Sequence, residues 1–101
     1  MQGYSWETGR SKQVVYTTSD GHVHELSVTV GGAWQHADLT AITGAPVGNL
    51  MGDGYSWETG RSKQVLYRTD DGHLHELSVT VEGAWQHADL TAITGAPVGG
   101  C

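Results

Sequence analysis

The chain has 101 residues, with 11 acidic and 5 basic side chains and a formal net charge of −6 at pH 7. This length allows at most one ordinary domain, and the acidic balance disfavours nucleic acid as a partner because like charges repel. No apolar run approaches the ~20 residues of a membrane-spanning helix, and no basic start with an apolar core indicates a signal peptide. We therefore expect no membrane partner and a chain that is made in the cytoplasm, and we assign no natural location.

The composition is typical of strands and turns. Trp and Tyr occur four times each, Phe is absent, Gly occurs 15 times and Pro only twice. Val and Thr, which favour strands, are abundant. Cys101 is the only cysteine, so it cannot form a disulfide within the chain. It could link two chains or accept a label, but we favour an appended residue with no natural role.

The segment from Gly3 to Gly48 recurs, at an offset of 51, from Gly54 to Gly99. Five of the 46 paired positions differ and the other 41 are identical. A fixed period of this size indicates a solenoid, a propeller or an array. We therefore predict one unit over residues 3–48, a linker over 49–53 and a second unit over 54–99. Such identity follows from recent duplication or from construction with a repeated module, and we favour construction.

Each unit begins with two predicted strands. Residues 4–8 alternate large apolar with polar side chains and stop at Gly9, which predicts a first strand. Residues 13–18 are β-branched and aromatic, which predicts a second strand. Asp20-Gly21 is a strong signal for a hairpin turn, and residues 22–30 form the predicted third strand.

The second half of the unit is shorter and richer in turn residues. Gly31-Gly32 predicts a turn, residues 33–38 a short fourth strand, and residues 39–48 a loop that carries Gly44-Ala45-Pro46. Four antiparallel strands predict an all-β fold in which each unit is one blade of a β-propeller. The apolar residues of the middle strands do not alternate cleanly, as expected for a sheet covered on both faces.

Two blades leave both outer faces bare, which predicts closure of the ring by further copies of the chain. Because each chain brings two blades, the ring has an even number of them. The first strand, expected nearest the axis, carries the bulky pairs Tyr4/Trp6 and Tyr55/Trp57, which favours a wide ring. We expect a cyclic homotetramer with eight blades, and next a homotrimer with six.

Three segments of the repeat form a recognisable pattern: Gln13-Val14-Val15-Tyr16-Thr17, Asp20-Gly21-His22-Val23-His24-Glu25-Leu26, and Gly32-Ala33-Trp34 with its continuation Gln35-His36-Ala37-Asp38-Leu39-Thr40-Ala41-Ile42-Thr43-Gly44-Ala45-Pro46. With these segments the repeat resembles the blades of the fucose-binding β-propeller lectins, and more closely the tandem-repeat propellers of actinobacteria. The resemblance covers nearly the whole chain. In the lectins the sugar lies between adjacent blades and is held by an Arg, a Glu and Trp side chains. The resemblance implies a carbohydrate site made of Glu25, Trp34, Glu76 and Trp85, while Val14 and Val65 stand where the lectins have Arg.

Each of these site residues also has a structural interpretation. Glu25 and Glu76 could accept hydrogen bonds from ligand hydroxyls or from the neighbouring blade. Trp34 and Trp85 could stack on a sugar ring or pack between blades. Two functions therefore stay open: a self-assembling scaffold, which we favour, and a carbohydrate-binding module. A glycan array distinguishes them.

His22 and His24 lie two apart on the predicted third strand, so their side chains share a face. Such a pair, with His36 as a third ligand, could hold zinc or copper. The same histidines could instead pack, form hydrogen bonds or be solvated, and we assign no metal or cofactor. The chain has no nucleophile elbow, no phosphate-binding loop and no Cys/His pair, so we expect a protein that is not an enzyme.

Overall fold

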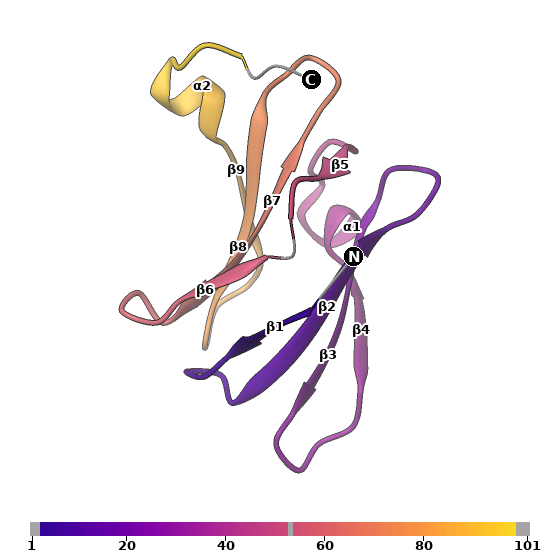
Figure 1. The fold of residues 1–101 in the computed structure, drawn as a ribbon, viewed down its shortest axis with the longest axis vertical. Helices are drawn as coiled ribbons and strands as arrows, with labels where there is room; N and C mark the ends of the chain where they lie inside the picture. The colour runs from indigo at the N-terminus through magenta and orange to yellow at the C-terminus, as the bar shows by residue number, and fades with distance from the viewer. Residues whose placement is uncertain (1–2, 53, 99–101) are drawn as a thin grey trace.

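The computed structural model describes residues 3–52 and 54–98, which form two antiparallel β-sheets, one for each repeat (Figure 1). The first sheet has the strand order β1-β2-β3-β4, so neighbours in sequence are neighbours in space. Its strands are β1 (Gly3–Trp6), β2 (Ser11–Thr17), β3 (Val23–Thr29) and β4 (Gln35–Asp38).

The first strand is shorter than the sequence predicts, because the chain turns after Trp6. Arg10, with a φ of 55°, has the left-handed backbone that ends this turn, and its amide donates to the Glu7 carbonyl. The predicted hairpin at Asp20-Gly21 is present, with Gly21 at a φ of 83°. The Asp20 carboxylate accepts the His22 amide, which fixes the turn where β3 starts.

The second sheet repeats this order and gains one strand. It comprises β6 (Tyr55–Trp57), β7 (Ser62–Arg68), β8 (Leu74–Thr80) and β9 (Gln86–Asp89). The linker expected at residues 49–53 contributes a fifth strand, β5 (Asn49–Leu50), which pairs with Arg68 and Tyr67 of β7. Gly48 permits this crossing, because a Cβ there would lie 2.5 Å from the Arg68 carbonyl oxygen.

Each repeat also contains a short helix where the sequence predicted only a loop. These helices are α1 (Leu39–Thr43) and α2 (Leu90–Thr94), so the prediction of an all-β chain is corrected to a mostly β one. Asp38 caps α1 by accepting the Ala41 amide at 3.0 Å, and Gly44 ends it in the left-handed conformation. One helical turn falls below the length at which hydrophobic periodicity is readable, but its caps were visible in the sequence.

The two sheets pack through opposite faces of the repeat. We call the face that carries Glu25 or Glu76 the Glu face, and the face that carries Lys12 or Lys63 the Lys face. Strand register places Val15 opposite Glu25 on the Glu face, and Val65 opposite Leu77 on the Lys face. The Glu face of the first sheet contacts the Lys face of the second.

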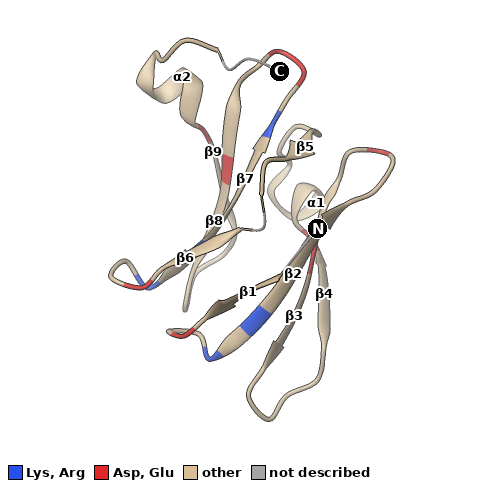
Figure 2. Ribbon diagram, in the orientation of Figure 1, with Lys and Arg blue, Asp and Glu red and all other residues tan. Residues whose placement is uncertain are grey.

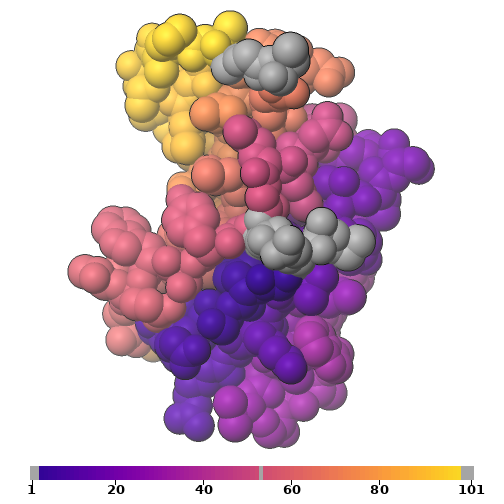
Figure 3. Space-filling model, viewed as in Figure 1, coloured from indigo at the N-terminus to yellow at the C-terminus, as the bar shows by residue number. Residues whose placement is uncertain are grey.

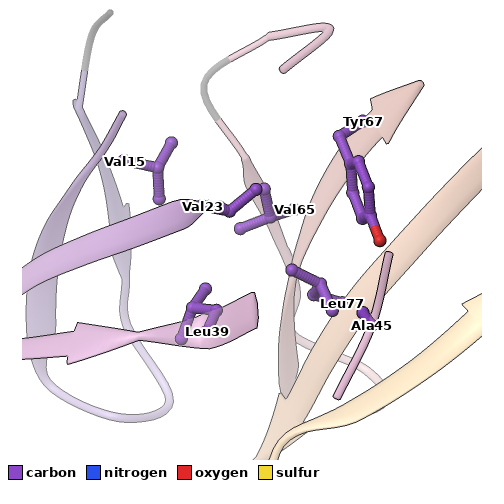
Figure 4. Packing of buried hydrophobic residues seen from close by; sticks show 7 residues of the cluster. All are labelled: Val15, Val23, Leu39, Ala45, Val65, Tyr67 and Leu77. Carbon is purple, nitrogen blue, oxygen red and sulfur yellow. The ribbon is translucent and has the colours of Figure 1, made fainter. Parts of the chain in front are cut away.

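A single hydrophobic core fills this contact (Figure 4). Val15 and Val23 of the first sheet are fully buried, as are Val65 and Leu77 of the second. The Tyr67 hydroxyl donates to the Pro46 carbonyl at 2.8 Å and so connects the second sheet to the segment after α1. Buried in the same core are Leu39, Ala45 and Tyr67.

The Lys face of the first sheet and the Glu face of the second face outward. Figure 3 shows the repeats as two lobes, the first in indigo to magenta and the second in pink to yellow. Over the described residues the sheets form an open pair, and no closed barrel or propeller is present. None of the described helices is long and apolar enough to cross a membrane.

Candidate functional site

A buried ion pair joins the two sheets. Lys63 lies on β7 and Glu25 on β3, and the Lys63 Nζ is 3.1 Å from the Glu25 carboxylate. Their side chains are only 8% and 4% exposed. A buried lysine or carboxylate without a partner is costly, so each of these groups requires the other to stay charged in the contact.

Aromatic side chains surround the ammonium group. The Lys63 Nζ lies 5.2 Å from the ring centroid of Trp6, on β1, and 5.4 Å from that of Trp85, which directly precedes β9. An indole face attracts a cation within about 6 Å, most strongly where water is excluded. The site is therefore an aromatic cage for an alkylammonium group, closed by one carboxylate.

Tyr4 completes the acceptor side of this cage. Its hydroxyl donates to the Glu25 Oε2 at 3.4 Å. Burial, together with the neighbouring Glu25 anion, raises the pKa of Tyr4 far above its usual value, so the hydroxyl keeps its proton and remains a donor. Burial also raises the pKa of Glu25, against the opposing effects of Lys63 and of the Tyr4 hydrogen bond.

The counterparts of the cage residues lie on the two outward faces. The lysine and one tryptophan are on one face, and the tyrosine, the glutamate and the other tryptophan are on the other. Lys12 on β2 lies 5.7 Å from the Trp34 ring centroid, and Trp34 is 54% exposed. On the other outward face the Tyr55 hydroxyl donates to Glu76 at 3.5 Å. Neither Lys12 nor Glu76 has an ion-pair partner among the described residues.

Hollows surround Lys12 on the Lys face of the first sheet. One, of about 340 Å³, is lined by Tyr4, Lys12, Gln13, Val14 and Trp34. A second, of about 590 Å³, extends from Lys12 to the β1–β2 turn. In the second sheet Lys63, at the position of Lys12, is buried against the first sheet.

The structure places the four residues of the predicted carbohydrate site in three different places. Glu25 and Trp85 lie at one cage between the sheets, where both contact Lys63. Trp34 and Glu76 lie on opposite outward faces and meet neither each other nor this cage. The ammonium of Lys63 occupies the space between Glu25 and Trp85 where the resemblance to lectins implied a sugar.

Sequence reasoning missed the two lysines. Val65 stands where the lectins have Arg. The Lys63 side chain lies on the same face of β7 as Val65, two residues earlier in the strand. Lys12 and Lys63 in the Ser-Lys-Gln segment were a usable signal, since a charged residue within a strand covered on both faces needs a partner.

Charges elsewhere gather at the turns that join the strands (Figure 2). One turn contact crosses between the repeats: the Glu58 carboxylate accepts the amides of Glu7 and Thr8 at 3.2 and 2.8 Å, and also the Thr8 hydroxyl. The hydrogen bond from the Thr8 hydroxyl, then one from the Ser56 side chain, and the two amide bonds lower the pKa of Glu58. The contact fixes the angle between the two sheets at their β1–β2 and β6–β7 turns.

The histidines form hydrogen bonds with protein groups. The His24 Nδ1 is 2.9 Å from the His36 Nε2, and the His22 Nδ1 is 2.9 Å from the Asp38 carboxylate. The second repeat has the same pairs, with His75 Nδ1 2.8 Å from His87 Nε2. Across residues 3–52 and 54–98 no three His, Cys, Asp or Glu side chains are grouped so that they could hold a metal ion.

Comparison with known proteins found no matching family, no matching curated protein and no matching solved structure.

Proposed function

We propose that the chain is a self-assembling two-blade module, in which the outward Lys face of one copy docks on the outward Glu face of the next and the copies close into a β-propeller. The cyclic homotetramer with eight blades is the favoured assembly and the homotrimer with six is the next. Each contact between copies repeats the contact between the two sheets of one chain. No catalytic step is proposed.

One observation carries this proposal: near-identical repeats bury opposite faces. Trp6 is 6% exposed, whereas its counterpart Trp57 is 61% exposed. Lys63 is buried, whereas its counterpart Lys12 is exposed. Each outward face therefore carries most of the residue types that already fit the opposite face within the chain, which is the condition for a head-to-tail contact. Three of the five differences between the repeats lie on the outward Glu face, where Leu66, Arg68 and Leu74 replace Val15, Thr17 and Val23.

Charge and backbone support the same docking. Glu76 on one outward face and Lys12 on the other reproduce the residue types of the Glu25–Lys63 pair. The edge of β2 adds a second feature: β5 pairs with Tyr67 and Arg68, but no described strand pairs with Tyr16 and Thr17 on the corresponding edge. An unpaired strand edge is a place where another chain can add a strand.

Native mass spectrometry with charge-reversal variants tests the proposal. The unmodified chain should form one closed oligomer at micromolar concentration. Lys12→Glu or Glu76→Lys alone should give monomers, because each puts like charges together in a buried contact. The double variant should associate again, and Glu82→Lys, in an exposed turn, is the matched control that should leave association intact. A stable micromolar monomer of the unmodified chain would overturn the proposal.

Carbohydrate binding is the second candidate function. The exposed indoles of Trp34 and Trp57 favour it, because a flat apolar ring is what a sugar face packs on. Residues of the site would be Glu25, Trp34, Glu76 and Trp85. A glycan array tests it: binding that Glu25→Gln and Glu76→Gln together weaken, with assembly retained, supports it. The absence of any binding at millimolar sugar leaves the scaffold alone.

A further inference from the structure

The Glu face of the second sheet carries the acceptor half of the cage without a lysine in it. Tyr55, Trp57 and Glu76 repeat Tyr4, Trp6 and Glu25. Between the sheets, Tyr4 donates to Glu25, while Glu25 and Trp6 contact the Lys63 ammonium. Tyr55 is 44% and Trp57 61% exposed. Among the described residues no cation pairs with Glu76.

This half-cage is organised before any cation arrives. The Tyr55 hydroxyl lies 3.5 Å from the Glu76 Oε2, close to the 3.4 Å between Tyr4 and Glu25 in the filled cage. The carboxylate therefore has the same tyrosine partner with and without a lysine beside it. A site whose acceptor is already oriented loses less entropy when its ligand binds.

We propose that the Glu face of the second sheet is a binding site for a primary alkylammonium group, which pairs with Glu76 and packs against Trp57. The alkylammonium group can come from two sources. One is the Lys12 side chain of a second copy, and binding of this source rests on the proposed function. The other is a free alkylammonium ion, whose binding does not depend on the proposed function. The occupied cage identifies the ligand class, because the group that Glu25 and Trp6 hold is an ammonium on a four-carbon stem.

The free ion should bind more weakly than a lysine of a second copy. Lys63 has a second indole, that of Trp85, in its own repeat. A free ion brings no such ring and finds only Trp57 and the carboxylate, partly in water. We expect a dissociation constant on the order of millimolar, as befits one exposed cation–π contact with one exposed charge pair.

The test is a titration with n-butylammonium chloride, followed by the indole N–H signals of the four Trp residues in NMR spectra. It uses the unmodified chain and Lys12→Gln, which removes the competing lysine of a second copy. Trp57→Phe identifies the Trp57 signal. Sodium chloride at equal ionic strength and 1-butanol, the neutral analogue, are the ligand controls. Glu76→Gln removes the acceptor, and Glu82→Gln is the matched control for loss of one charge.

In Lys12→Gln we expect a saturable shift of the Trp57 signal with n-butylammonium and none with 1-butanol. Glu76→Gln should weaken the binding at least about fivefold, as expected for loss of a charged partner, and Glu82→Gln should not change it. In the unmodified chain at associating concentrations, higher n-butylammonium should be needed, because Lys12 of the next copy competes.

Three results would overturn the inference: no Trp57 shift up to about 100 mM, which is far weaker than the millimolar range expected; an equal shift with 1-butanol; or binding that survives Glu76→Gln unchanged. Failure of the proposed function is distinguishable from these. If the unmodified chain stays monomeric but Lys12→Gln binds n-butylammonium through Glu76, self-assembly is refuted and the ammonium site stands.

Discussion

The two repeats differ at five of 46 paired positions, yet equivalent residues have opposite surroundings. In the first repeat the Glu face is covered: Trp6 is 6% exposed and Val15 is fully buried. In the second the Lys face is covered, and Val65 and Leu77 are fully buried. Local sequence therefore fixes the strands and their faces, while the neighbouring sheet decides which face is buried. As a result the two ends of the sheet pair are different: one end presents a Lys face and the other presents a Glu face.

The largest difference between the repeats should appear when the tryptophan at the end of each first strand is replaced and the free energy of unfolding is compared. Trp6→Ala removes a buried indole that packs on Lys63, and should lower the free energy of unfolding by about 3–5 kcal/mol. Trp57→Ala should change it by less than about 0.5 kcal/mol in a chain kept monomeric by Lys12→Glu, because that indole is in water. Urea unfolding measures both. Equal losses would contradict the packing of the sheets.

A smaller difference should separate the two lysines. Lys63→Met leaves the buried Glu25 without a cation and should cost about 2–3 kcal/mol, reduced from the full penalty because Glu25 can take up a proton. Lys12→Met, the matched control in the other repeat, should leave the stability of the monomer unchanged. A double-mutant cycle of Lys63→Met with Glu25→Gln measures the coupling, and a coupling near zero would show that the pair contributes nothing.

The smallest difference should appear in the pH dependence of stability. Burial, opposed by Asp89 and Asp71 and assisted by His87 and His73, lowers the pKa of His75 below its usual value of 6.5. Below pH 6.5 the unfolded chain therefore binds a proton at this histidine more readily than the folded chain does. This contribution to stability is present above pH 6.5 and decreases as the pH falls below it, by less than about 1 kcal/mol by pH 5.

His75→Gln removes this contribution, and its matched variant is His24→Gln, in the half-exposed counterpart. The comparison is made between unfolding free energies at pH 7 and 5 for each variant and for the unmodified chain. Subtraction is needed because His73, whose pKa Asp89 raises, responds to acid in the opposite direction. If both variants flatten the pH profile equally, burial of His75 is not the cause.

Strand order and hairpins could be predicted from the sequence because they depend on local signals. The Asp20-Gly21 turn and the β-branched run before it lie within a few residues of each other, and both are present in the structure. The helix at Leu39–Thr43 was missed although Asp38 and Gly44 mark its ends. A single turn of helix leaves no periodicity, so only its caps could have revealed it.

The site was harder to predict because it depends on which face of one sheet meets which face of the other. Glu25 and Trp85 were named from their residue types and from the resemblance, and they do meet. Lys63 was not named, because its role arises only when a second sheet removes it from water. Nor could one repeat taken alone show that Trp34 and Glu76 would face outward, since their counterparts Trp85 and Glu25 have nearly the same local sequence.

Because the two sheets belong to one chain, the contact between them has an effective concentration that does not depend on the concentration of the protein. Strand β5 follows the first repeat in the chain and pairs with β7 of the second sheet. The second sheet therefore meets the first as if it were present at millimolar levels, whatever the concentration of the chain. A contact of the same kind between copies depends on how many copies are present. In the proposed assembly, dilution should therefore release intact two-sheet units, each with its own core closed, long before it separates the sheets within one unit.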